Sequence, residues 1–144
     1  MLLRRTLTTE LVLGVVALSA TGALSTYAPS IAVSSGPYAT SAVMGPLRLE
    51  VTVDPAKIGP NQLHLYLFDR RTGAPFDETK GLRVTAALPE KGIAPIAMAA
   101  HVAGPGHFVV DGASLPVKGK WAMSVVDRVS DFDEYEARFT APIK

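Results

Sequence analysis

The chain of 144 residues contains no cysteine. This absence excludes disulfide bonds, zinc–thiolate sites, iron–sulfur clusters and a cysteine nucleophile at once. Charge is also scarce: 19% of the residues are charged, and the 14 basic and 13 acidic residues leave a net charge of +1. A nucleic-acid-binding protein would show a strong basic excess, so we expect no nucleic-acid partner. The apolar fraction of 48% is too high for a disordered chain.

Charge is missing altogether between Glu10 and Arg48. This gap follows a basic start and precedes an evenly charged C-terminal part. We therefore divide the chain into an apolar leader over residues 1–28, a flexible linker rich in serine, glycine and proline over 29–46, and a body over 47–144. The body is long enough for one small hydrophobic core but not for two.

The leader fits two kinds of segment. A secretory signal peptide has a basic start, an apolar core of about 7–15 residues and a small-residue cleavage site, which would fall near Ala23 or Ala28. A transmembrane helix needs about 17–25 mostly apolar residues, and residues 7–28 supply them. We favour the membrane anchor, because Glu10 is unusual in a signal peptide but tolerable one turn into an anchored helix. Both alternatives place the body outside the cytoplasm, since the two arginines at the start stay inside.

Apolar and polar residues alternate along the body with the period of half-buried strands. Turn residues such as Gly104-Pro105-Gly106 interrupt the alternation about every ten residues. No stretch holds a convincing helical period. We predict an all-β fold, a seven-stranded immunoglobulin-like β-sandwich preceded by one N-terminal transmembrane helix, with Trp121 as the largest core side chain. The seven strands are expected at residues 47–53, 63–68, 82–88, 96–102, 107–111, 121–125 and 134–139.

Imidazole and thioether groups are the softer metal ligands that this sequence offers. Together they favour copper, and the thioether selects the cuprous ion. Neither a His-x-His nor a His-x-x-x-His pair occurs, so spacing alone favours ordinary strand, turn and core residues over a metal site. The candidate ligands are His64, His101, His107, Met44, Met98 and Met123.

Two other kinds of site are disfavoured. An acidic run near the C-terminus lacks the spacing of an EF-hand, so we interpret it as a solvated face rather than a calcium site. No Gly-x-Ser-x-Gly nucleophile elbow is present, and no paired carboxylates stand in an apolar setting, so we expect no enzymatic activity. The acidic run comprises Asp127, Asp131, Asp133, Glu134 and Glu136.

An ordered set of short motifs spans nearly the whole chain. It resembles the C-terminal part of bacterial CopD-type copper resistance and transport proteins, in which a last transmembrane helix precedes an extracytoplasmic YtkA-like domain. The motifs are Leu3-Arg4-Arg5, Glu10 at the start of an apolar helix, Val53-Asp54-Pro55, Ile58-Gly59-Pro60-Asn61, Leu63-His64-Leu65-Tyr66, Gly92-Ile93-Ala94-Pro95, Gly104-Pro105-Gly106-His107-Phe108, Gly119-Lys120-Trp121 and Asp131-Phe132-Asp133.

The resemblance implies a role in copper handling and narrows the candidate ligands. His64 and His107 are the two histidines that lie within the shared motifs, so they are the expected metal ligands, with a methionine as a soft third. The helices that carry the transport path in that family have no counterpart in these 144 residues, which implies an accessory part rather than transport by this chain alone. The implied partners are the membrane, a helical copper-transport membrane protein and a copper-binding envelope protein. The alternative function is an envelope interaction module that binds no metal.

Overall fold

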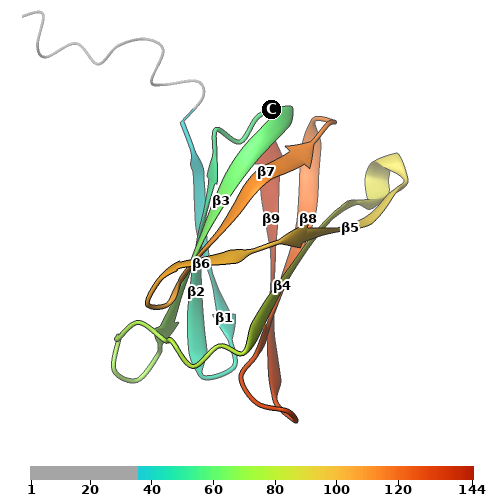
Figure 1. Ribbon diagram of the computed structural model, residues 1–144. Helices are drawn as coiled ribbons and strands as arrows, with labels where there is room; N and C mark the ends of the chain where they lie inside the picture. The colour runs from blue at the N-terminus through green and yellow to red at the C-terminus, as the bar shows by residue number, and fades with distance from the viewer. Residues whose placement is uncertain (1–35) are drawn as a thin grey trace, which may run out of the picture. The chain divides into compact units, whose positions relative to one another are not determined.

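A computed structural model of the chain describes residues 36–144 (Figure 1). The predicted transmembrane helix within residues 1–28, and the first part of the predicted linker, lie outside these residues. Over residues 36–144, no helix has both the length and the apolar character needed to cross a membrane. The single helical element in this range is the short 3-10 turn η1, Pro89–Lys91.

Nine strands in residues 36–144 form two antiparallel sheets, where seven strands were predicted. The first sheet has the order β1-β2-β3-β7-β6 and the second has the order β5-β4-β8-β9. For residues 36–144, the prediction of an all-β fold with two packed sheets is confirmed. The strands are β1 (Tyr38–Met44), β2 (Leu47–Asp54), β3 (Gly59–Asp69), β4 (Gly81–Leu88), β5 (Ile93–Ala99), β6 (His101–Gly104), β7 (His107–Leu115), β8 (Gly119–Arg128) and β9 (Glu134–Ile143).

One hydrophobic core lies between the inner faces of the two sheets. Strand alternation directs its members inward, as in β3, where Leu63, Leu65 and Leu67 are all fully buried. Trp121 on β8 is the largest fully buried side chain, at 0% exposure. Its indole Nε1–H donates to the backbone carbonyl of Val117 at 2.8 Å, so its polar atom is satisfied inside the core.

Strand β1 corrects the predicted linker. Residues 38–44, which we placed in a linker expected to run extended or mobile, are extended and pair along their whole length with β2, from Tyr38 opposite Val53 to Met44 opposite Leu47. A two-residue turn joins the strands, and its Gly45 has a φ of 58°, the positive value that such hairpins favour. The small residues of β1 carry little alternation of hydrophobicity, so its pairing depends on backbone hydrogen bonds to β2 rather than on a recognisable apolar pattern.

The predicted strand over residues 96–102 is in fact two strands in different sheets. Strand β5 pairs with β4 in the second sheet, and β6 pairs with β7 in the first. Figure 1 shows them as one ribbon that passes from one sheet to the other. The strand is interrupted at Ala100, which lies in an almost wholly apolar run. No alternation of apolar and polar residues marks the change of sheet there.

Candidate metal centre

The pairing of β3 with β7 brings His64 and His107 to one surface. The register aligns Tyr66 with His107 and His64 with Val109. Since Leu63 and Leu65 point into the core, the side chains between and beside them stand on the outer face of the first sheet. His64 and His107 are therefore diagonal neighbours on that face, although they are 43 residues apart in the chain.

The imidazole rings of His64 and His107, called the histidine pair below, are in direct contact. Nδ1 of His64 lies 3.1 Å from Nε2 of His107. The two ring centroids are 5.4 Å apart, and the ring of Tyr66 stacks on His107 at a centroid distance of 4.2 Å. The rings of Tyr66 and His107 are within 12° of parallel, so the tyrosine supports one side of the histidine.

A chain of polar contacts continues from His64 along the outer face. Nε2 of His64 lies 3.1 Å from Oε1 of Gln62. The amide nitrogen of Gln62 donates to Oδ1 of Asp111 at 2.6 Å. The second carboxylate oxygen of Asp111 lies 3.6 Å from Nδ1 of His101. All three histidines are thus within one network around Val109, which is itself only 5% exposed on this outer face.

The surroundings of His107 disfavour its charged form. Partial burial, and next the neighbouring His64 and His101, lower the pKa of His107 below its usual value of 6.5. A neutral imidazole keeps a nitrogen lone pair that can bind a metal ion, whereas an imidazolium has none. The environment of His107 therefore favours the neutral state that a metal ligand needs.

The methionines do not complete the site. Met44 and Met123 are buried in the core, and Met98 packs against it. All three thioethers therefore lie on the core side of the sheets, away from the face that carries the histidine pair. Among residues 36–144, no group of three or more histidine, aspartate or glutamate side chains is placed to hold a metal ion. A methionine as a soft third ligand therefore stays a prediction, and none of these three lies beside the histidine pair in this arrangement.

Gln62, Tyr66 and Asp111 form part of the network but were not predicted as site residues, whereas His101 was already a candidate ligand from the sequence. Alternation along the strands predicts on which face these residues lie. Gln62 and Tyr66 share the outward parity of His64, and Asp111 shares that of His107. What the sequence lacks is the identity of the neighbouring strand, since sequence alternation assigns a face but not a partner.

The acidic run divides between two environments. Asp131, Asp133, Glu134 and Glu136 are exposed, as expected of a solvated face. Asp127 is 0% exposed, which corrects our interpretation of that residue. It follows Trp121, Met123 and Val125 at the same alternation on β8 and so points into the interior.

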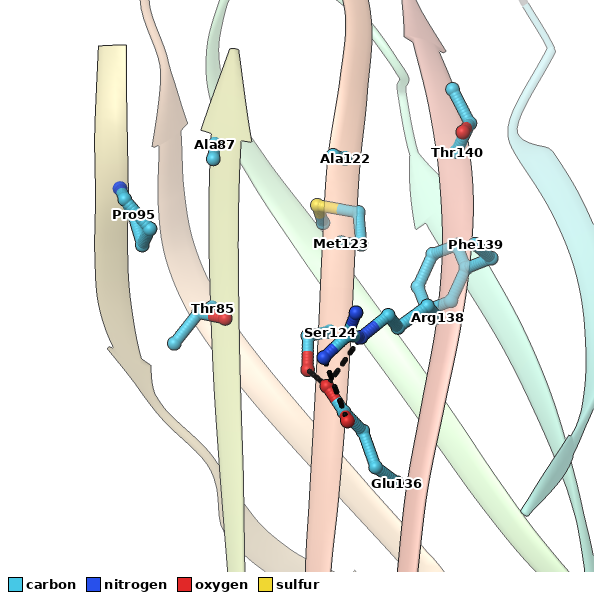
Figure 2. A pocket seen from close by; sticks show the side chains of 10 residues that line it. All are labelled: Thr85, Ala87, Pro95, Ala122, Met123, Ser124, Glu136, Arg138, Phe139 and Thr140. Carbon is cyan, nitrogen blue, oxygen red and sulfur yellow. Dashed lines mark hydrogen bonds and ion pairs between the residues drawn. The ribbon is translucent and has the colours of Figure 1, made fainter. Parts of the chain in front are cut away.

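A groove of about 520 Å³ lies on the outer face of the second sheet (Figure 2). Small side chains such as Ala87 and Ala122 line it, with Pro95 on β5 at one side. Figure 2 shows Ser124 and Arg138 directed at Glu136, and both donate to its carboxylate at 2.7 Å. Hydrogen bonds from Arg138 and then Ser124 hold the pKa of Glu136 below its usual range, so this carboxylate is a paired anion.

Comparisons of the whole chain with protein-family models, with curated proteins and with solved structures find no match.

Proposed function

We propose that this protein handles cuprous copper outside the cytoplasm and that the histidine pair is its copper site. The observation that carries the proposal is the 3.1 Å separation between Nδ1 of His64 and Nε2 of His107. Two imidazole nitrogens that face each other at this distance are a small rearrangement away from sharing one ion. The CopD-type resemblance supports copper as that ion, because both histidines lie in its motifs.

The rearrangement needed for copper is an opening of the histidine pair. Two nitrogens bound at about 2.0 Å to one metal lie about 3.3 Å apart at a tetrahedral angle and about 4 Å apart when they are opposite each other. The observed separation is below both values, so the rings would open by a few tenths of an ångström to about 1 Å. Only side chains move in this step, because β3 and β7 hold the backbone register.

The coordination that this chain offers suits transfer of copper rather than permanent storage. The histidine pair supplies two nitrogen donors on a partly exposed surface, and the methionines lie in or against the core. A copper ion held by two donors keeps an open side, to which a thioether or imidazole of a partner can bind. We therefore propose exchange of copper with an envelope copper-binding protein or with a helical copper-transport membrane protein.

We also propose that residues 1–28 anchor the chain in the cell membrane as a single span. The long uncharged stretch after Arg4 and Arg5 supports this topology, and the positive-inside tendency then places the domain on the extracytoplasmic side. Protease added to intact spheroplasts should remove the domain and leave the membrane segment protected. A domain that survives this treatment would contradict the topology, and a mature protein that begins near Ala28 would favour a cleaved signal peptide.

The order of the strands supports the finer assignment of an immunoglobulin-like topology. The neighbours β2-β3-β7-β6 follow the A-B-E-D order of that fold, and β4-β8-β9 follow C-F-G, with β5 in the place of an added C′ strand. Strand β1 then extends the first sheet beyond its A strand. This assignment places the histidine pair on the B and E strands, in the middle of the A-B-E-D sheet rather than among the end loops.

The copper proposal is tested by titration of the full chain in detergent with cuprous ion against a competing chelator. We expect the His64→Ala, His107→Ala double variant to lose the tight binding of the wild type. His101→Ala is the matched control, because His101 belongs to the same network but not to the pair, and it should keep most of the affinity. Affinity should fall below about pH 6.5, where imidazoles become protonated. Equal affinity in the wild type and the double variant would reject the site.

A second candidate function is an envelope interaction module without metal. Strand β5 is an edge strand of the second sheet, and its continuation into β6 leaves Ile96 40% and Val102 70% exposed. An edge strand can pair with an extended strand of another envelope protein. Charged substitutions at Ile96 and Val102 would abolish such an association and leave copper affinity unchanged, whereas the histidine variants would do the reverse.

A further inference from the structure

We infer that Asp111 and Gln62 are positioning residues that fix the tautomer of His64, so that copper binds through Nδ1 of His64 and Nε2 of His107. The inference deepens the proposed copper function and rests on it. Hydrogen bonds connect Asp111, Gln62, His64 and His107 in that order. Each hydrogen bond has one donor and one acceptor, and the inference follows from the direction in which these bonds run.

The first step is the orientation of the Gln62 amide. The carboxylate of Asp111 has no hydrogen to give and can only accept hydrogen bonds. The contact of 2.6 Å between the Gln62 side chain and Oδ1 of Asp111 therefore requires the amide NH₂ of Gln62 at that end. The amide oxygen Oε1 is then directed at His64, as the contact of 3.1 Å shows.

The second step is the position of the hydrogen on His64. An amide oxygen can only accept, so Nε2 of His64 must carry the hydrogen in its contact with Gln62. A neutral imidazole has one N–H, which leaves Nδ1 of His64 with a free lone pair. That lone pair is directed at His107, 3.1 Å away.

The third step concerns His107. In the metal-free protein, Nε2 of His107 must donate to the free Nδ1 of His64, because two lone pairs would otherwise face each other. When copper enters, the hydrogen on Nε2 of His107 moves to Nδ1 of the same ring, and the imidazole stays neutral. The ring of His64 needs no such change, because its hydrogen bond to Gln62 already leaves Nδ1, the nitrogen that would bind copper, without a hydrogen.

Asp111 can fill this role while it also contacts His101. Its Oδ1 accepts from Gln62, and its Oδ2 is the oxygen that lies 3.6 Å from Nδ1 of His101. The two contacts use different oxygens, so they are compatible. Ligand histidines commonly need a hydrogen-bond partner of this kind at their other nitrogen, and removal of such a partner typically weakens metal affinity about 10–100-fold.

The test begins with the metal-free full chain in detergent, labelled with ¹⁵N-histidine, at about pH 8 where the imidazoles are neutral. The chain has three histidines, so the long-range ¹H–¹⁵N spectrum can be assigned with single substitutions. We expect His64 in the Nε2–H form and His107 also in the Nε2–H form. A wild-type His64 that carries its hydrogen on Nδ1 would overturn the inference.

Asp111→Asn is the informative variant. An asparagine can donate as well as accept, so Gln62 becomes free to rotate and the Nδ1–H form of His64 should appear. Cuprous affinity, measured against a chelator, should fall about 10–100-fold. Asp131→Asn is the matched control, because the Asp131 side chain is 75% exposed and pairs with Lys80, outside the network.

A double variant separates positioning from a merely structural role. In Gln62→Glu combined with Asp111→Asn, the amide and the carboxylate change places, and the glutamate can again only accept from His64. The Nε2–H form and the copper affinity should both return. A tautomer that shifts in Asp111→Asn without loss of affinity would overturn the positioning role. A wild type that binds no cuprous ion would overturn the proposed function and the ligand assignment together, while the spectrum of the metal-free protein would still decide the hydrogen-bond direction.

Discussion

Nε2 of His107 lies 3.1 Å from Nδ1 of His64, and this contact depends on the fold rather than on the local sequence. His64 is in the middle of β3, and His107 is the first residue of β7. The two rings meet because β3 pairs with β7 and not with another strand. The electrostatic influence of each ring on the other therefore exists only in the folded protein and is lost on unfolding.

The first prediction is that the metal-free protein loses stability as the pH falls below about 6.5. The pKa of His107 is lowered in the folded protein, by burial first and by His64 next. The unfolded chain then binds more protons than the folded chain in this range, so stability rises with pH and is lost as the pH falls through the folded pKa. The loss is measured as a fall in Tm in thermal denaturation experiments between about pH 8 and about pH 5.

The matched variants for this prediction are His107→Gln and His101→Gln. The first should flatten the dependence of Tm on pH, because it removes the group whose pKa is lowered. The second removes an exposed histidine and should leave the dependence close to that of the wild type. A wild-type Tm that rises on acidification over this range would contradict the assignment.

The sequence reveals which face a residue occupies better than which strand it meets. Alternation alone places His64 on the outer face, because Leu63 and Leu65 on either side of it are core residues. Its contact with His107 could not be derived, since β3 and β7 are separated by β4, β5 and β6. Strand β1 was not predicted for a different reason. Ala39 is small and Ser41 is polar, so neither gives the apolar alternation that predicts a strand, and β1 forms through backbone pairing with β2.

The second prediction concerns Trp121. Its side chain is fully buried, and Ala141 lies opposite it on β9, so its removal would leave a large cavity that small neighbours cannot fill. Trp121→Ala should reduce the free energy of unfolding by about 3–5 kcal/mol, measured by urea denaturation. Trp121→Phe keeps most of the apolar volume but loses the hydrogen bond to Val117, so its loss should be smaller. A wild-type midpoint in Trp121→Ala would contradict the core assignment.

The third prediction concerns the turn before His107. Gly106 has a φ of 62°, and a Cβ at this position would lie 2.7 Å from the carbonyl oxygen of Leu67 and 2.9 Å from the backbone nitrogen of Phe76. Gly106→Ala therefore combines a left-handed backbone cost of about 1–2 kcal/mol with a steric cost of about 1–3 kcal/mol. The free energy of unfolding, measured at equilibrium, should fall by both the backbone cost and the steric cost.

Gly73→Ala is the control for this turn. Gly73 has a similar φ of 74°, but no atom lies within 4 Å of the Cβ position. It should show the backbone cost alone. Equal losses in the two variants would mean that the turn at Gly106 relaxes around the added methyl group, and the steric argument would then fail.

Asp127 is a residue whose inward position alternation could have indicated. It continues the series Trp121, Met123 and Val125 on β8, so the period of two directs it into the core. Its charge led us to group it with the acidic residues that follow. The general preference of carboxylates for solvent is weaker evidence than an uninterrupted alternation on a single strand.

The last prediction is that Asp127→Asn stabilises the protein at neutral pH. Oδ2 of Asp127 accepts from the hydroxyl of Thr79 at 3.3 Å, and Oδ1 is buried with no hydrogen-bond partner. Burial raises the pKa of Asp127 above its usual 3.8, against the opposing hydrogen bond from Thr79. The stability associated with the protonated acid is complete below about pH 3.8 and is lost as the pH rises through the folded pKa, so the charged form weakens the fold at neutral pH.

The asparagine side chain has nearly the same shape, keeps an oxygen for Thr79 and has no charge to bury. A neutral unpaired amide costs less in the interior than a carboxylate, so we expect a gain on the order of 1 kcal/mol at about pH 7. The difference from the wild type should shrink toward about pH 4, as the wild-type acid becomes protonated. Asp131→Asn, at an exposed position, should change stability by less than about 0.5 kcal/mol. A loss of stability in Asp127→Asn at neutral pH would show that the carboxylate has a stabilising partner in the folded protein.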